Sequence, residues 1–147
     1  MNKVESLRKN RQLVISYAFH QSGHKLVSHL YIADGKRAIM LYSCSVHYDD
    51  IKPIEISRAN RYLHWQDILY FKETGYRVYD FLGLSIDEED REQQNINKFK
   101  RGFGGREELN YNSYTAQTMK GKVMLLLLRW KWRNQPEIIN RKAIIDL

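Results

Sequence analysis

A short turn signal between two runs of strand-forming residues constrains the fold of this chain most strongly. The dipeptide Asp34-Gly35 separates residues 26–33 from residues 37–45, and both runs are rich in apolar and β-branched side chains. Asp-Gly between two such runs is typical of a β-hairpin. A third run, residues 13–19, ends just before Ser22-Gly23. The sequence therefore predicts an antiparallel meander of three strands.

The segment after this meander predicts a helix that returns the chain to the sheet. Ser57 is the expected N-cap, residues 58–74 the helix and Gly75 its C-terminal stop. Helical spacing assigns the buried stripe to four apolar residues: Tyr62, Trp65, Ile68 and Leu69. Further along, we expect a buried strand at residues 77–84, a short helix at 95–101 ended by Gly102, and a strand at 107–115.

This order of elements predicts an α+β fold, with a mixed, mostly antiparallel sheet flanked by helices. The chain of 147 residues has the length of a single domain, 1–147, with one core. Its tail, residues 116–147, is basic and apolar. Spacing within residues 123–128 favours a helix, although residues 129–133 alternate as a strand would.

The net charge of +7 is concentrated in one part of the chain. Residues 98–133 carry nine Lys and Arg against two Glu, and 9 − 2 already gives +7. Such a local field favours a phosphate-rich partner: a nucleotide-containing cofactor, the end of a tRNA or an anionic lipid surface. A solvated basic face without a ligand is the alternative. Tryptophans among the basic residues of 120–133 also suit a membrane surface or a protein partner.

The remaining composition favours a reducing compartment. The single Cys44 has no internal disulfide partner, and no clustered His or Cys spacing suggests a metal site. The N-terminus is too polar for a signal peptide, and no apolar run approaches the roughly 20 residues of a membrane span. We expect a cytoplasmic protein, with peripheral membrane association as an alternative.

Three short motifs follow one another between residues 59 and 105. A helical motif contains Asn60, Leu63, His64 and Trp65; a strand motif reads Tyr-Asp-Phe-Leu-Gly from Tyr79; and a glycine-rich turn reads Phe-Lys-Arg-Gly-Phe-Gly from Phe99. In this order they resemble the C-terminal half of FemABX-like acyltransferases, which build on the GNAT fold. The resemblance covers about residues 13 to 115.

The resemblance implies transfer of an acyl or aminoacyl group to an amine of a cell-envelope precursor or sugar. The donor would be an acyl-CoA or an aminoacyl-tRNA, with no metal. Lys100 would hold a donor phosphate or stabilise the oxyanion. Asp80 would orient the acceptor amine or act as a base, and His64 would serve as a base or proton relay. Each residue also has a structural alternative. Lys100 would be an ordinary surface lysine, Asp80 would pair with an Arg or Lys, and His64 would pack as a helical residue.

Six further residues are predicted to bind the donor: Ser57, Arg58, Asn60, Lys98, Arg101 and Gly104. Three of them surround the expected start of the helix, where free backbone N–H groups would meet a pyrophosphate.

The chain departs from the GNAT or FemABX-like pattern in three ways. It lacks the glycine of the acyl-CoA loop of GNAT proteins, as FemABX-like proteins lack a clean version of that loop, and this points to aminoacyl-tRNA as the donor. Leu82 stands where the strand motif of the family has its first glycine. Finally, the chain resembles one domain of a family that usually has two, so it would be a lone half, a homodimer subunit or an inactive remnant. An acetyl-CoA-dependent N-acetyltransferase and a noncatalytic binding module remain the alternative functions.

Overall fold

The computed structural model describes residues 3–108 and 115–133. The chain divides into two compact units, Met1–Leu82 and Gly83–Leu147.

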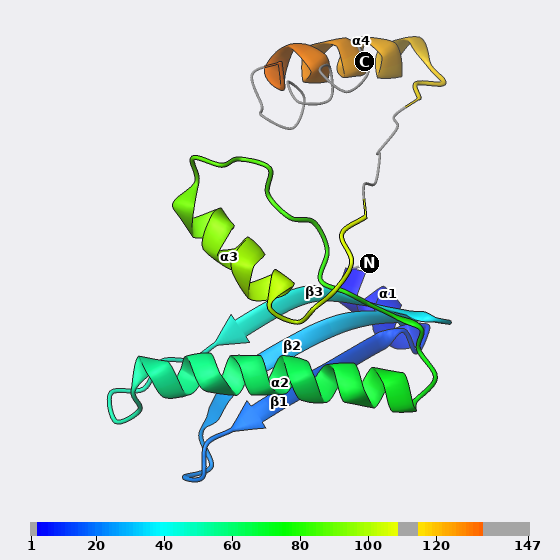
Figure 1. Cartoon of the computed structure of the whole chain (residues 1–147). Coiled ribbons are helices and arrows are strands. Elements are labelled where there is room, and N and C mark those ends of the chain that lie inside the picture. Colours follow the sequence, from blue (N-terminus) through cyan, green and yellow to red (C-terminus); the bar gives the residue numbers. More distant parts are fainter. Residues whose placement is uncertain (1–2, 109–114, 134–147) are drawn as a thin grey trace. The chain divides into compact units, whose positions relative to one another are not determined.

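The first unit is a four-stranded sheet with a long helix across one face (Figure 1). Its elements are, in order, α1 (Lys3–Lys9), β1 (Leu13–Phe19), β2 (Lys25–Asp34), β3 (Arg37–Ser45), α2 (Pro53–Glu73) and β4 (Val78–Asp80). The strands lie in the order β1-β2-β3-β4; the first three are antiparallel, and β4 runs parallel to β3. The predicted α+β class, the mixed sheet and the three-stranded meander are confirmed.

The hairpin between β2 and β3 turns one residue later than the sequence signal suggested. Asp34 still pairs with Arg37, so the two loop residues are Gly35 and Lys36. Gly35 has a φ of 57°, a left-handed conformation that glycine adopts at little cost.

Helix α2 ends as predicted but begins earlier. At the end, the Gly75 N–H donates to Lys72 O and the Tyr76 N–H to Phe71 O, which is a Schellman motif with Gly75 at a φ of 91°. At the start, the expected N-cap Ser57 is wrong: Lys52 is the N-cap and Pro53 the first helical residue. Proline suits this position because its φ is already helical and its missing N–H would have no helical partner anyway.

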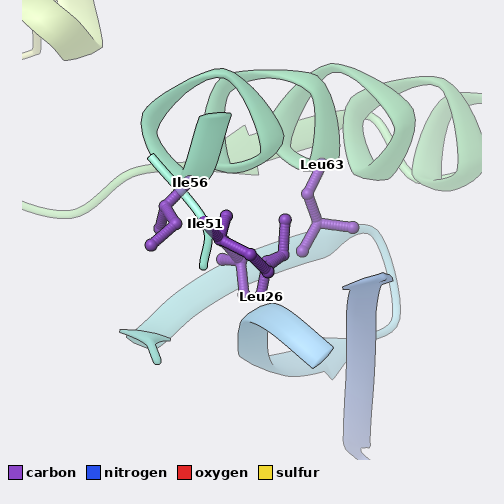
Figure 2. Packing of buried hydrophobic residues seen from close by; sticks show 5 residues of the cluster. Leu26, Ile51, Ile56 and Leu63 are labelled. Atoms are coloured by element: carbon purple, nitrogen blue, oxygen red, sulfur yellow. The ribbon is translucent and has the colours of Figure 1, made fainter. Parts of the chain in front are cut away.

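The face of α2 that packs on the sheet is not the predicted aromatic stripe. Tyr62 and Trp65 are 62% and 51% exposed, whereas the helix buries five other residues: Ile56, Leu63, His64, Asp67 and Phe71. Leu26, Ile51, Ile56 and Leu63 converge under one end of the helix (Figure 2). A second cluster, Tyr31, Ala33, Ala38 and Phe71, lies under the other end.

Strand β4 is much shorter than the predicted strand 77–84. It stops at Asp80 because the carboxylate of Asp80 accepts a hydrogen bond from the backbone N–H of Leu82 at 2.7 Å, which turns the chain. Leu82 itself has a φ of 62°, in the left-handed region that strains a residue with a Cβ.

The second unit contains α3 (Arg91–Arg101) and α4 (Met119–Lys131). Helix α3 starts four residues before the predicted start because the side chain of Asp90 caps it, accepting the N–H of Gln93 at 3.0 Å. Gly102 follows its last residue, as predicted. Helix α4 lies in the tail segment for which a helix was favoured, with Thr118 as its N-cap. Residues 107, 108 and 115 are not in a strand, and the rest of that predicted strand lies outside the described residues.

Amide side chains attach the segment that follows Gly83 to α3. Asn97, which is buried, accepts the N–H of Ser85 at 3.1 Å and donates to the carbonyl oxygen of Ser85 at 2.7 Å. Gln94 Nε2 donates to Asp87 O at 2.7 Å. These bonds satisfy backbone groups that no strand partner pairs. None of the helices among the described residues has the length and apolarity to traverse a bilayer.

We expect replacement of Leu82 by glycine to stabilise the first unit. The change relieves left-handed strain of about 1–2 kcal/mol, offset in part by the added freedom of glycine in the unfolded chain, so the free energy of unfolding should rise by about 0.5–1 kcal/mol. Urea unfolding measures it. Val46→Gly is the matched control, because Val46 is about equally exposed and its φ is negative; it should destabilise. A loss of stability in L82G would contradict the strain argument.

Candidate functional site

A buried carboxylate joins α2 to the sheet. Asp67, which is 5% exposed, accepts three hydrogen bonds on Oδ2: from Ser16 Oγ of β1 at 2.9 Å, and from His29 Nδ1 and Tyr31 OH of β2 at 2.8 and 2.6 Å. An ionised carboxylate is costly to bury unless such donors replace the water it loses. The three donors therefore explain why an acidic residue can lie on the buried face of α2.

The hydrogen bonds continue from Asp67 to His64 through two tyrosines. Tyr31 OH lies 2.8 Å from Tyr79 OH, which lies 2.9 Å from His64 Nδ1. Because the one hydroxyl proton of Tyr31 is donated to Asp67, Tyr79 must donate to Tyr31. Tyr79 then accepts from His64, which assigns the ring proton of His64 to Nδ1.

His29 extends the same hydrogen bonds in the other direction. Its Nε2 lies 2.8 Å from Oδ1 of Asn60, and Ser43 Oγ of β3 donates to that oxygen at 3.4 Å. Both ring nitrogens of His29 thus lie within hydrogen-bond distance of side-chain oxygens, Asp67 Oδ2 at Nδ1 and Asn60 Oδ1 at Nε2. The His29 and His64 rings pack with centroids 4.1 Å apart. We call the residues Ser16, His29, Tyr31, Asn60, His64, Asp67 and Tyr79 the polar network.

Burial sets the protonation of the network. Loss of solvent raises the pKa of Tyr31 and Tyr79 far above the ordinary tyrosine value, so both hydroxyls stay protonated. Loss of solvent, aided by the neighbouring His29, lowers the pKa of His64 to about 3. His64 is therefore neutral at physiological pH. Every buried side-chain nitrogen or oxygen among the described residues has a hydrogen-bond partner.

The network lies beside a place where the sheet opens. Strand β4 pairs only with Arg37, Ala38 and Ile39, whereas β3 continues to Ser45. Within the described part of the first unit, residues 40–45 of β3 therefore have no strand partner on the β4 side. Two residues of the polar network lie next to this segment. Asn60 of α2 is hydrogen-bonded to Ser43 of β3, and Tyr79 lies on β4 itself. A free strand edge of this kind can bind an extended ligand through backbone hydrogen bonds.

The predicted site residues of the first unit occupy two different settings. His64 and Asn60 belong to the polar network. Asp80 lies outside it, and its Oδ2 is 3.2 Å from Nε of Arg37, so Asp80 has the arginine partner that its structural reading required.

Ser57 and Arg58 are exposed on the second turn of α2. Their backbone N–H groups lie inside the helix, where they bond to the preceding turn. These N–H groups are therefore not the free amides of a helix start, on which the predicted anion site depended, because the helix begins at Pro53. At its true start, Pro53 has no N–H and Glu55 adds a negative charge, which makes that end a poor site for a pyrophosphate.

The other predicted site residues lie in the second unit, at the end of α3. Lys100 Nζ donates to the carbonyl oxygen of Gly83 at 2.6 Å, and Arg101 Nε lies 2.6 Å from a carboxylate oxygen of Glu107. Lys98 is exposed, and Gly104 has a φ of 75°. Cations at this position also stabilise the negative end of the helix dipole.

The central residues of the network, His29, Tyr31 and Asp67, were not among the predicted site residues. Two patterns in the sequence could have identified them. Val27, His29, Tyr31 and Ala33 alternate along β2 and so share one face. On α2, the spacing of Asn60, His64, Asp67 and Phe71 is as helical as that of the apolar residues. Among the described residues, no group of three His, Cys, Asp or Glu side chains is placed to hold a metal ion.

Removal of the Asp67 carboxylate should destabilise the first unit strongly. In Asp67→Ala the half-buried donor of Ser16 and the buried donors of His29 and Tyr31 lose their shared acceptor. We expect a loss of about 3–5 kcal/mol in unfolding free energy by urea titration. Asp50→Ala, at an exposed position, should change it by less than about 0.5 kcal/mol. Tyr31→Phe should cost less in the Asp67→Ala background than in the native chain; equal costs would show that the two groups are not coupled.

The low pKa of His64 predicts a loss of stability in acid. Between the ordinary pKa of 6.5 and the folded value of about 3, the unfolded chain binds a proton that the folded chain excludes. Stability should therefore fall as pH falls through this range, by up to about 1.4 kcal/mol per pH unit. In His64→Asn, the side-chain amide can place an N–H donor near the position of Nδ1 but does not titrate in this range. This variant should therefore flatten the dependence of the urea midpoint on pH, whereas the exposed control His47→Asn should not. An unchanged slope in His64→Asn would contradict the assignment.

No family model, no curated protein and no solved structure matches this chain. The resemblance to FemABX-like acyltransferases therefore stays a prediction that rests on the three motifs. The geometry of the first unit, with its polar network and open strand edge, stands independently of it.

Proposed function

We propose that this chain is an acyltransferase of GNAT-like fold that transfers an acyl or aminoacyl group to an amine of a cell-envelope precursor or sugar. One observation carries the proposal: the parallel β3–β4 pair ends after three residues, beside a buried polar network. This arrangement supports binding of an extended donor at the β3 edge. The order of three strands, a helix and a further strand is also the order that the sequence patterns predicted.

The chemistry requires that a neutral amine attack the donor's carbonyl carbon. A C–N bond forms, the C–S bond of a thioester or the C–O bond of an aminoacyl ester breaks, the amine loses a proton and the leaving group gains one. Backbone N–H groups on the free edge of β3 are suited to hold the donor and to stabilise the oxyanion.

His64 fits a positioning role better than that of a base. A base with a pKa of about 3 removes a proton from an ammonium group only at a large cost in free energy. His64 instead fixes Tyr79, and through His29 the network fixes Asn60 next to Ser43. We therefore assign to the network the task of holding this end of the β3 edge rigid.

An aminoacyl-tRNA is the favoured donor over acyl-CoA. The start of α2 offers little to a pyrophosphate, because Pro53 lacks an N–H and Glu55 is acidic. The basic residues Lys98, Lys100 and Arg101 remain the candidates for donor phosphates. For Lys100 that role competes with its hydrogen bond to Gly83 O, which is the structural alternative.

Direct assay separates these functions. The purified chain is incubated with isotopically labelled aminoacyl-tRNA or acetyl-CoA and with amino-sugar or peptide amine acceptors, and mass spectrometry detects the acylated acceptor. We expect transfer from aminoacyl-tRNA. Absence of transfer from both donors, together with no shift of the thermal midpoint by either, would reject the enzyme proposal.

Within that assay, Lys100→Ala should lower the transfer rate about tenfold or more if the ammonium holds a donor phosphate. Lys72→Ala is the matched control, since Lys72 also lies in the last turn of a helix and is exposed. Circular dichroism verifies that each variant is folded. An undiminished rate in folded Lys100→Ala would contradict the phosphate-binding role and would favour a structural role, such as the bond to Gly83 O.

A further inference from the structure

Helix α4 has an apolar stripe that is exposed within the described part of the second unit. Five apolar residues recur at helical spacing and are between 55% and 74% exposed: Met119, Val123, Leu126, Leu127 and Trp130. Three more apolar residues lie on the other side of the helix: Met124, which is exposed, and the half-buried Leu125 and Leu128. At about 100° per residue, they occupy one face of roughly 100° of arc. Single exposed apolar residues are ordinary, but five on one helix face mark a docking surface.

Basic residues border this stripe on both sides. On the helical wheel, Lys120 and Lys131 fall along one edge, and Lys122 and Arg129 along the other. Just beyond the helix, the guanidinium of Arg133 lies 5.4 Å from the ring centroid of Trp130. Residues 115–133 contain no Asp or Glu, so the face and both its borders carry only positive charge.

We propose that α4 binds the surface of a membrane that contains anionic lipids. The stripe would enter the boundary between head groups and acyl chains, and the bordering Lys and Arg side chains would reach up to the lipid phosphates. Trp130 suits this depth, because an indole ring combines apolar area with a polar N–H. This inference is independent of the proposed transferase activity.

The length and chemistry of α4 favour a membrane surface over a membrane span, an RNA or a protein groove. The uninterrupted apolar run, residues 123–128, is about 9 Å long as a helix, whereas the hydrocarbon core is about 30 Å thick, so α4 lies in the interface and does not span it. Aliphatic Val and Leu side chains offer nothing to an RNA backbone or to its bases. A protein groove would cover the stripe, but it would not account for cations along both borders.

Vesicle co-sedimentation of the full chain tests the proposal. We expect binding to vesicles of phosphatidylcholine with phosphatidylglycerol, little binding to phosphatidylcholine alone, and loss of binding at high salt. Tryptophan fluorescence should shift to shorter wavelength in the presence of the anionic vesicles. Equal binding to both vesicle types, or to neither, would overturn the proposal.

Matched variants locate the contact. Leu126→Gln should weaken vesicle binding about threefold or more, while Ile54→Gln, at a similarly exposed apolar position on α2, should not. The double variant Lys122→Gln/Arg129→Gln should weaken it about tenfold or more. Trp130→Ala should weaken vesicle binding more than Trp132→Ala, because Trp132 lies off the stripe. Circular dichroism verifies folding.

Three further outcomes would reject the lipid surface as the occupant. Leu126→Gln could convert a dimer to a monomer in light scattering without any vesicle binding by the native chain, which would make the stripe an interface between copies. Single-stranded RNA could be bound through α4 in place of vesicles. Ile54→Gln could weaken vesicle binding as much as Leu126→Gln, which would place the contact elsewhere.

Discussion

The first unit depends on one buried carboxylate more than on any apolar contact. One oxygen of Asp67 accepts hydrogen bonds from side chains of β1 and β2, and these bonds fix how α2 lies on the sheet. Apolar clusters lie toward both ends of the helix, but apolar packing tolerates small shifts, whereas three hydrogen bonds to one atom do not. A polar network of this kind specifies a single arrangement, because any other leaves several buried groups unpaired.

Sequence patterns identified the elements whose cause is local. The meander follows from alternating strand residues around a glycine turn, and the end of α2 follows from Gly75, because each signal acts within a few residues. The start of α2 was missed because Ser57 was preferred as a cap although Pro53 begins a helix equally well. The end of β4 was not predicted because it depends on a side chain: the carboxylate of Asp80 accepts the backbone N–H of Leu82.

The buried face of α2 could not be predicted from hydrophobicity. Tyr62 and Trp65 are more apolar than His64 and Asp67, yet the structure exposes the first pair and buries the second. The free energy of burying a polar group depends on partners elsewhere in the chain, here on β1, β2 and β4, and a single helix sequence does not contain them. The same limit explains why Asn60 and His64 were named as site residues while their partner His29 was not.

The network is closed toward the core and reaches the open sheet edge only at one end. On the side of Asp67, each polar atom is satisfied by another residue of the unit. At the other end, Asn60 joins His29 to Ser43, which lies in the segment of β3 that does not pair with β4. A strand edge without a neighbouring strand would ordinarily be soft, and a ligand that bound there would have to order it. Because His29 and Asn60 link Ser43 of this edge to a buried carboxylate, we expect the edge to be ordered before any ligand arrives. Rigidity at the open edge is thus the property that connects the core of this unit with the function proposed for it.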